Sequence, residues 1–205
     1  SCNFADVVSH FIPHHVAANF ELAWPEAESI AEEMRGNYGL GNGPLPSKQL
    51  FAMLGLTSRA FDTLNASRST RPYGLRLRET GAQDKVMFHS RRPNARRFEL
   101  ARALGDAVRY PGEKMGPMTE TRTYRQRFQR AFAQAFLCPF EGLRSYIDAE
   151  RPELDDIEAA ASHFKVSPRV ILNILVNKRS ISRAEYRRLQ RDLTAEWIAG
   201  TSAEQ

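Results

Sequence analysis

The sequence contains few cysteines and no long apolar run, and both absences narrow the class of protein. Its 205 residues include two cysteines, Cys2 and Cys138, too few for the disulfide framework of a small secreted domain. A zinc site built from four cysteines is excluded for the same reason. The longest stretch without Asp, Glu, Lys or Arg is Val7–Phe20, which is too short to span a membrane. We therefore expect a cytoplasmic protein that does not insert into membranes.

Several common catalytic and targeting motifs are also missing. There is no GxSxG motif, P-loop or GxGxxG motif, so the usual serine hydrolases and nucleotide hydrolases have no support. The chain does not open on a basic segment followed by an apolar run, as a signal peptide would. Its first residue is not Met, which is compatible with a piece of a longer chain.

The positive charge is concentrated in two blocks. The net charge is +5, with 11 basic and 4 acidic residues in 90–134, and 8 basic and 1 acidic in 165–191. Residues 135–164 instead carry 2 basic and 7 acidic residues. Blocks of this kind favour anionic partners such as nucleic acid. The alternative is that they are solvated helix faces balanced by acidic neighbours.

Hydrophobic periodicity predicts an α-rich chain with one hairpin. Apolar residues recur at helical spacing in 94–108, 121–137 and 139–149. A strand is expected over Tyr73–Glu79, with Tyr73, Leu75 and Leu77 as its buried face, because these residues alternate with Gly74, Arg76 and Arg78. A second strand is expected over Lys85–His89. The fold class is therefore α+β.

A boundary is expected near Arg151-Pro152, which divides the chain into 1–150 and 151–205. In the second part, helices are predicted from Leu154 to Phe164, from Pro168 onward, and after Ser182. Two helices separated by the short link Lys165–Ser167 have the rhythm of a helix-turn-helix.

Three segments resemble the ImmA/IrrE family of zincin-like metallopeptidases. Arg96–Asp106, RRFELARALGD, resembles the family's RRFTLAHELGH segment. Ala131–Pro139, AFAQAFLCP, resembles its xFAAxLLMP segment, and Ile157–Arg179 resembles its helical tail with an fxVS link. The similarity covers roughly 25–190. It implies an α-rich zincin-like core with a small β-sheet, followed by a helix-turn-helix-like helical tail.

The same resemblance places the catalytic positions, and all of them are changed. The first zinc-binding histidine corresponds to Arg102, the general base to Ala103 and the second histidine to Asp106. Arginine cannot ligate zinc, and alanine has no base to offer. The third ligand is expected on the next helix, yet 121–137 contains no Asp, Glu, His or Cys. We therefore expect no catalytic residue, no metal and no cofactor.

A degenerate member of the family implies a retained cleft, for which the candidate residues are Arg102, Asp106 and Arg130. Arg102 and Asp106 lie four residues apart, so an ion pair between them in place of the metal is one hypothesis. In the tail, a DNA groove or phosphates could be contacted by Ser167, Arg169, Asn173, Lys178 and Arg179. The competing interpretation is that this apolar tail only packs on the core.

The preferred hypothesis is a non-catalytic regulator of transcription. The resemblance implies binding to a repressor or other regulatory partner protein, to a ligand or to DNA, and fusion behind an N-terminal DNA-binding domain also fits. One alternative is a peptidase that cleaves a repressor with an unusual metal set, Asp106 with Glu99, Glu113 or Glu120. The other is a transcription factor that binds DNA directly through the tail. A homodimer stays open.

Overall fold

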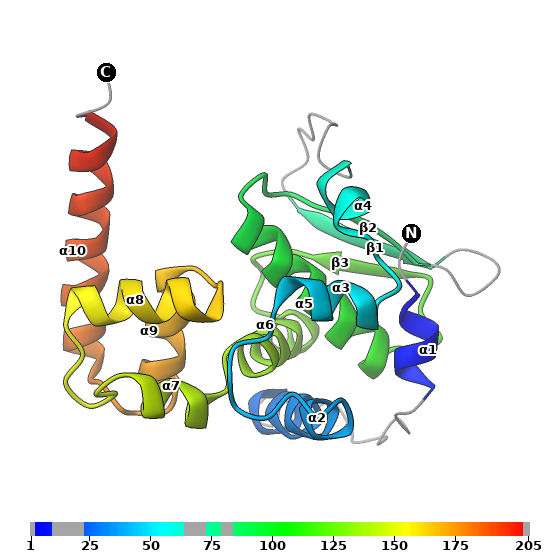
Figure 1. Ribbon diagram of the computed structural model, residues 1–205, viewed down its shortest axis with the longest axis horizontal. Coiled ribbons are helices and arrows are strands. Elements are labelled where there is room, and N and C mark those ends of the chain that lie inside the picture. The colour runs from blue at the N-terminus through cyan, green and yellow to red at the C-terminus, as the bar shows by residue number, and fades with distance from the viewer. Residues whose placement is uncertain (1–2, 10–22, 64–72, 79–83, 203–205) are drawn as a thin grey trace. The chain divides into compact units, whose positions relative to one another are not determined.

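The computed structural model describes residues 3–9, 23–63, 73–78 and 84–202 (Figure 1). The fold is α+β, with many helices and one small antiparallel sheet, as predicted. The chain divides into two compact units. The core unit comprises Ser1–Gly41 and Leu45–Leu137, and the tail unit comprises Asn42–Pro44 and Cys138–Gln205.

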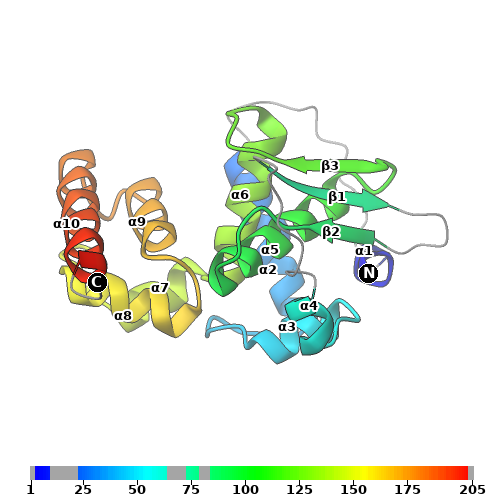
Figure 2. The ribbon, with the colours of Figure 1, turned by 90° about the horizontal axis from the view of Figure 1, so that it is seen from above.

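The core unit holds six helices and three strands within its described residues. In chain order they are α1 (Phe4–Val8), α2 (Ala23–Asn37), α3 (Ser47–Met53), α4 (Ser58–Thr63), β1 (Gly74–Arg78), β2 (Asp84–Met87), α5 (Pro93–Arg109), β3 (Met115–Met118) and α6 (Tyr124–Leu137). The sheet order is β2-β1-β3, and both outer strands run antiparallel to β1 (Figure 2). The pair β1–β2 confirms the predicted strands. β3 was not predicted, because its Gly116 and Pro117 are typical of turns rather than strands.

The predicted burial of β1 is wrong in phase. Arg76 is almost fully buried and Gly74 is buried, whereas Tyr73 is 41% exposed and Leu75 and Leu77 are only half-buried. Arg76 points inward because two buried carboxylates, Asp84 and Asp106, accept its hydrogen bonds. Specific ion pairs can therefore override the alternation of apolar residues along a strand.

Helix α5 is the centre of the core unit. It packs against the sheet on one side and against α6 on the other, and α6 in turn packs against α2 (Figure 1). Gly105 allows the close approach of α5 to α6, since a Cβ there would lie 2.6 Å from Cδ1 of Phe132. Phe128, Phe132 and Phe136 are fully buried along α6, and their rings stack in sequence. This packing fixes the α5 positions that resemble the zinc-binding motif.

The tail unit contains α7 (Phe140–Tyr146), α8 (Leu154–Phe164), α9 (Pro168–Asn177) and α10 (Arg183–Ser202). The three predicted tail helices are present. The tight link between α8 and α9 depends on Lys165, which ends α8 with a φ of 55° in the left-handed region. Helix α7 belongs to this unit because the ring of Tyr146 stacks on His163 of α8, with centroids 4.1 Å apart. The division therefore falls after Leu137, earlier than the predicted boundary at 150.

Candidate functional site

The three α5 residues at the positions of the metallopeptidase motif, Arg102, Ala103 and Asp106, are all buried. Asp106 has no exposed surface and lies among α5, α6 and the sheet. A carboxylate in such a place is costly unless cations and hydrogen-bond donors surround it. The structure shows which donors surround the Asp106 carboxylate.

Two arginines and one amide hold the Asp106 carboxylate. Arg125 donates from Nε to Oδ1 at 2.6 Å and from Nη2 to Oδ2 at 2.9 Å. Arg76 donates from Nε and Nη2 to Oδ2 at 3.1 and 3.0 Å, and Gln129 donates to Oδ1 at 2.8 Å. The hydrogen bond with Asp106 raises the pKa of Arg125 above its ordinary value. Both oxygens of Asp106 are therefore fully engaged.

Arg76 joins this network to a second buried acid. Its Nη1 donates to Oδ1 of Asp84 at 3.0 Å, within the β1–β2 pair. Burial raises the pKa of Asp84, although Arg76 opposes that shift. The buried Arg76 side chain therefore links β2, β1 and α5 through Asp84 and Asp106.

The hypothesis of an Arg102–Asp106 ion pair is wrong. Arg102 instead donates from Nη2 to the carbonyl oxygen of Thr119 at 2.8 Å, and to Oε1 of Gln126 at 2.7 Å. A longer bond of 3.3 Å reaches Oε1 of Gln129, whose amide nitrogen donates to Asp106. Asp106 prefers Arg76 and Arg125, whose forked guanidinium groups reach it from neighbouring elements. Gln129 thus lies between Arg102 and Asp106 and hydrogen-bonds to both.

Arg130 shares a hydrogen-bond acceptor with Arg102 and not with Asp106. It donates to the carbonyl oxygens of Thr119 and Thr121 at 3.2 and 2.9 Å, so both arginines hold the loop between β3 and α6. The three predicted cleft residues therefore make no direct ion pair with one another, but Gln129 joins Arg102 to Asp106, and Arg102 and Arg130 share the Thr119 carbonyl oxygen. Sequence patterns gave no signal for Gln126 and Gln129, and Arg76 was placed on the wrong face.

These donors do not fit a catalytic zinc site. The positions corresponding to the ligands hold Arg102 and a saturated Asp106, and α6 offers glutamines and arginines. The alternative metal set does not assemble either: Glu99 accepts hydrogen bonds from the backbone of His89 and Ser90, and Glu113 and Glu120 are exposed. Within the described ranges, no three His, Cys, Asp or Glu side chains gather closely enough to hold a metal.

Part of the basic block 90–134 is internal, whereas its residues Arg91, Arg92, Lys114, Arg122 and Arg127 are exposed. Arg96, Arg97 and Arg102 are at most 4% exposed. Arg96 lies over the Phe61 ring and donates to that residue's carbonyl oxygen, while Arg97 donates to the Leu45 carbonyl and to Ser47. These arginines tie loops to α5 and cannot meet phosphates.

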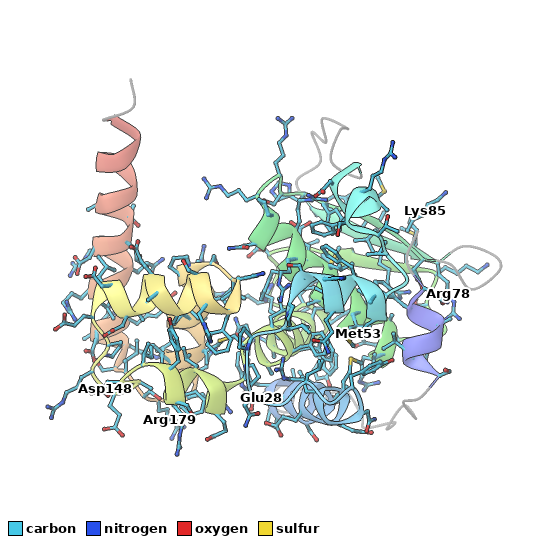
Figure 3. The ribbon with its side chains drawn as sticks, in the orientation of Figure 1. Glu28, Met53, Arg78, Lys85, Asp148 and Arg179 are labelled. Carbon is cyan, nitrogen blue, oxygen red and sulfur yellow. The ribbon has the colours of Figure 1, made fainter. Side chains whose placement is uncertain are left out.

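The five DNA-binding candidates of the tail unit do not share one environment. Ser167, Arg169 and Arg179 are exposed, and Arg179 is labelled in Figure 3. Asn173 accepts a hydrogen bond from the Tyr186 hydroxyl at 3.0 Å, and the ammonium of Lys178 lies 5.6 Å from the Phe140 ring centroid. An open pocket of about 560 Å³ is lined by Glu158, Ser167, Pro168, Arg169, Leu172, Gln190, Leu193 and Thr194. Of these five candidates, the two exposed arginines therefore lie near opposite ends of α9.

Comparison with family models, with curated proteins and with solved structures finds no match. None of the helices in the described part of the chain combines the length and apolar character of a membrane span. The fold and site define an α+β protein whose central helix carries buried arginines and a carboxylate whose two oxygens are both engaged by donors.

Proposed function

We propose that this chain is a non-catalytic regulatory protein that binds a partner protein and thereby controls transcription. The observation that carries the proposal is the engagement of Asp106 by Arg76, Arg125 and Gln129. A metallopeptidase needs a free position on a metal and a base beside it. Here the corresponding residues form a structural polar network that leaves neither.

The resemblance to ImmA/IrrE peptidases supports the regulatory part of the proposal, because those proteins act on transcriptional repressors. A core that keeps this arrangement of helices and loses the ligands keeps surface for a repressor or another regulatory partner. Because the sequence holds only two cysteines, the cytoplasm is the compartment that we propose.

Metal content and peptidase activity test the proposal directly. After dialysis against zinc and then against buffer, the purified chain should retain far less than one zinc ion per chain, measured by elemental mass spectrometry. Incubation with unfolded casein should give no new fragments. One retained zinc per chain together with cleavage that a chelator abolishes would contradict the proposal.

Direct DNA contact through the tail unit is a second candidate, favoured by the exposure of Ser167, Arg169 and Arg179 around α9. The variant Arg169→Gln/Arg179→Gln should bind duplex DNA more weakly, and the salt slope of its affinity should fall by about 2. The control Arg144→Gln/Arg151→Gln removes the same charge from exposed sites on and after α7. Equal binding and equal slopes in both double variants would remove α9 from consideration.

A further inference from the structure

Arg102 is a buried cation that donates no hydrogen bond to a carboxylate of the described residues. Its side chain is 5% exposed, and its Nε has no hydrogen-bond partner among the described residues. Nη2 is occupied by neutral acceptors, and Nη1 lies 3.7 Å from Oε1 of Glu120. That distance is too long for a hydrogen bond. The Nη1 edge of the guanidinium is therefore the side at which a better-placed carboxylate can accept a hydrogen bond.

Further positively charged side chains lie near the Nη1 edge of Arg102. Burial and then the nearby Arg130 lower the pKa of Arg102 to about 10. Burial lowers the pKa of Arg130, Glu120 opposes that shift, and the nearby Arg127 and Arg122 add to it. The described residues provide one carboxylate within ion-pair distance of Arg102, that of Glu120. Glu99 and Asp106 also favour the charged form of Arg102, but both are already engaged by other donors.

Glu120 shows where the missing anion would enter. Its side chain is 88% exposed, so the Nη1 side of Arg102 faces the surface. The loop itself is fixed by other groups: Thr119 donates from its backbone to Gln126, and the hydroxyls of Thr119 and Thr121 lie 2.8 Å apart. The Glu120 side chain can therefore swing away without any change of the loop.

We propose that Arg102 and Arg130 form a binding site for a carboxylate side chain of an acidic segment in a partner protein, which takes the place of Glu120. The site deepens the proposed function and rests on it, since it gives the core unit a means of recognising a regulatory partner. An Asp or Glu in an extended peptide can reach inward as Glu120 does.

A peptide fits this site better than duplex DNA. DNA binding depends on several exposed cations that track a stiff phosphate backbone. Around α5 the guanidinium groups of Arg76, Arg96 and Arg97 are buried and turned to internal acceptors. The recessed Arg102 requires a narrow anionic group on a flexible stem, which a carboxylate side chain provides.

Glu120→Gln is the first test, because it removes the internal competitor and leaves the buried residues untouched. The probe is a short fluorescein-labelled peptide of alternating Glu and Gly, followed by fluorescence anisotropy at fixed low salt. We expect about fivefold tighter binding, a factor typical of one partly exposed charge pair. The control Glu33→Gln removes the same charge from an exposed position on α2 and should bind like the unmodified chain.

Arg130→Gln is the second test and should weaken binding of the same peptide about fivefold. Arg130→Lys keeps the charge and should retain most of the binding. The control Lys48→Gln removes an exposed positive charge from α3 and should have little effect. Thermal unfolding of each variant separates lost binding from lost folding.

Different outcomes contradict the binding site and the non-catalytic function. Identical affinities for the unmodified chain, Glu120→Gln and Arg130→Gln would overturn the assignment of the site, as would Arg130-dependent binding of duplex DNA but not of the peptide. The mass of the recovered peptide addresses the underlying function separately. Cleavage would contradict a non-catalytic role, whereas an intact peptide that ignores both residues would contradict only the site.

Discussion

Asp106→Asn is expected to lower the free energy of unfolding by about 3–5 kcal/mol, the usual cost of removing one partner from a buried ion pair. The substitution keeps the size of the side chain and removes its charge. Arg125 then loses its carboxylate, and Arg76 keeps only Asp84. The asparagine amide also places a donor where arginines already donate. Urea unfolding followed by circular dichroism measures the change.

Two further variants serve as comparisons for this prediction. Arg125→Gln should cost less than Asp106→Asn, because the Arg125 side chain is 24% exposed and its removal leaves Arg76 with the carboxylate. Glu33→Gln, on the exposed face of α2, should change stability by no more than about 0.5 kcal/mol. A loss below about 1 kcal/mol for Asp106→Asn would show that water or other groups replace the network, contrary to our interpretation.

The network also explains how polar residues of α5 can be buried in the core unit. Arg76, Arg125 and Gln129 converge on Asp106 and link the sheet, α5 and α6. A buried ionic cluster does not by itself prove high stability, but it favours one arrangement of those elements.

Local patterns were sufficient for the helices and insufficient for the polar interior. The helical spacing of apolar residues predicted α5 and α6, and Ser167-Pro168 correctly marked the start of α9. Each of these signals acts over one or two helical turns. The partners of Asp106 come instead from β1 and α6, and no local pattern reveals such long-range pairing.

The wrong predictions for Arg76 and Arg102 have a common physical origin. Arg76 was placed on the exposed face of its strand, and Arg102 was paired with Asp106 on its own helix, because both inferences considered one element at a time. Burial of an arginine depends on carboxylates from other elements, as Asp84 and Asp106 show. The excess of arginines over acids near α5 is the sequence signal that could have indicated buried arginines. This excess is larger than a solvated helix face requires.

Gly116→Ala is expected to cost about 3 kcal/mol, because the added methyl group enters the same network. A Cβ at Gly116 on β3 would overlap Oδ2 of Asp106 and lie 2.9 Å from its Cγ and 3.1 Å from Nε of Arg76. The strand would have to move away from α5 or the carboxylate would have to leave its arginines. The control is Gly112→Ala, where a Cβ has no neighbour within 4 Å, with an expected change of at most about 0.5 kcal/mol.

A double-mutant cycle distinguishes this clash from a general intolerance of β3 to side chains. In an Asp106→Ala background the obstructing carboxylate is absent, so the cost of Gly116→Ala should fall by at least about 1 kcal/mol. Equal costs in both backgrounds would mean that the strand, and not the approach to Asp106, requires glycine. A smaller cost in the Asp106→Ala background would show that Gly116 is needed because β3 passes directly against the Asp106 carboxylate.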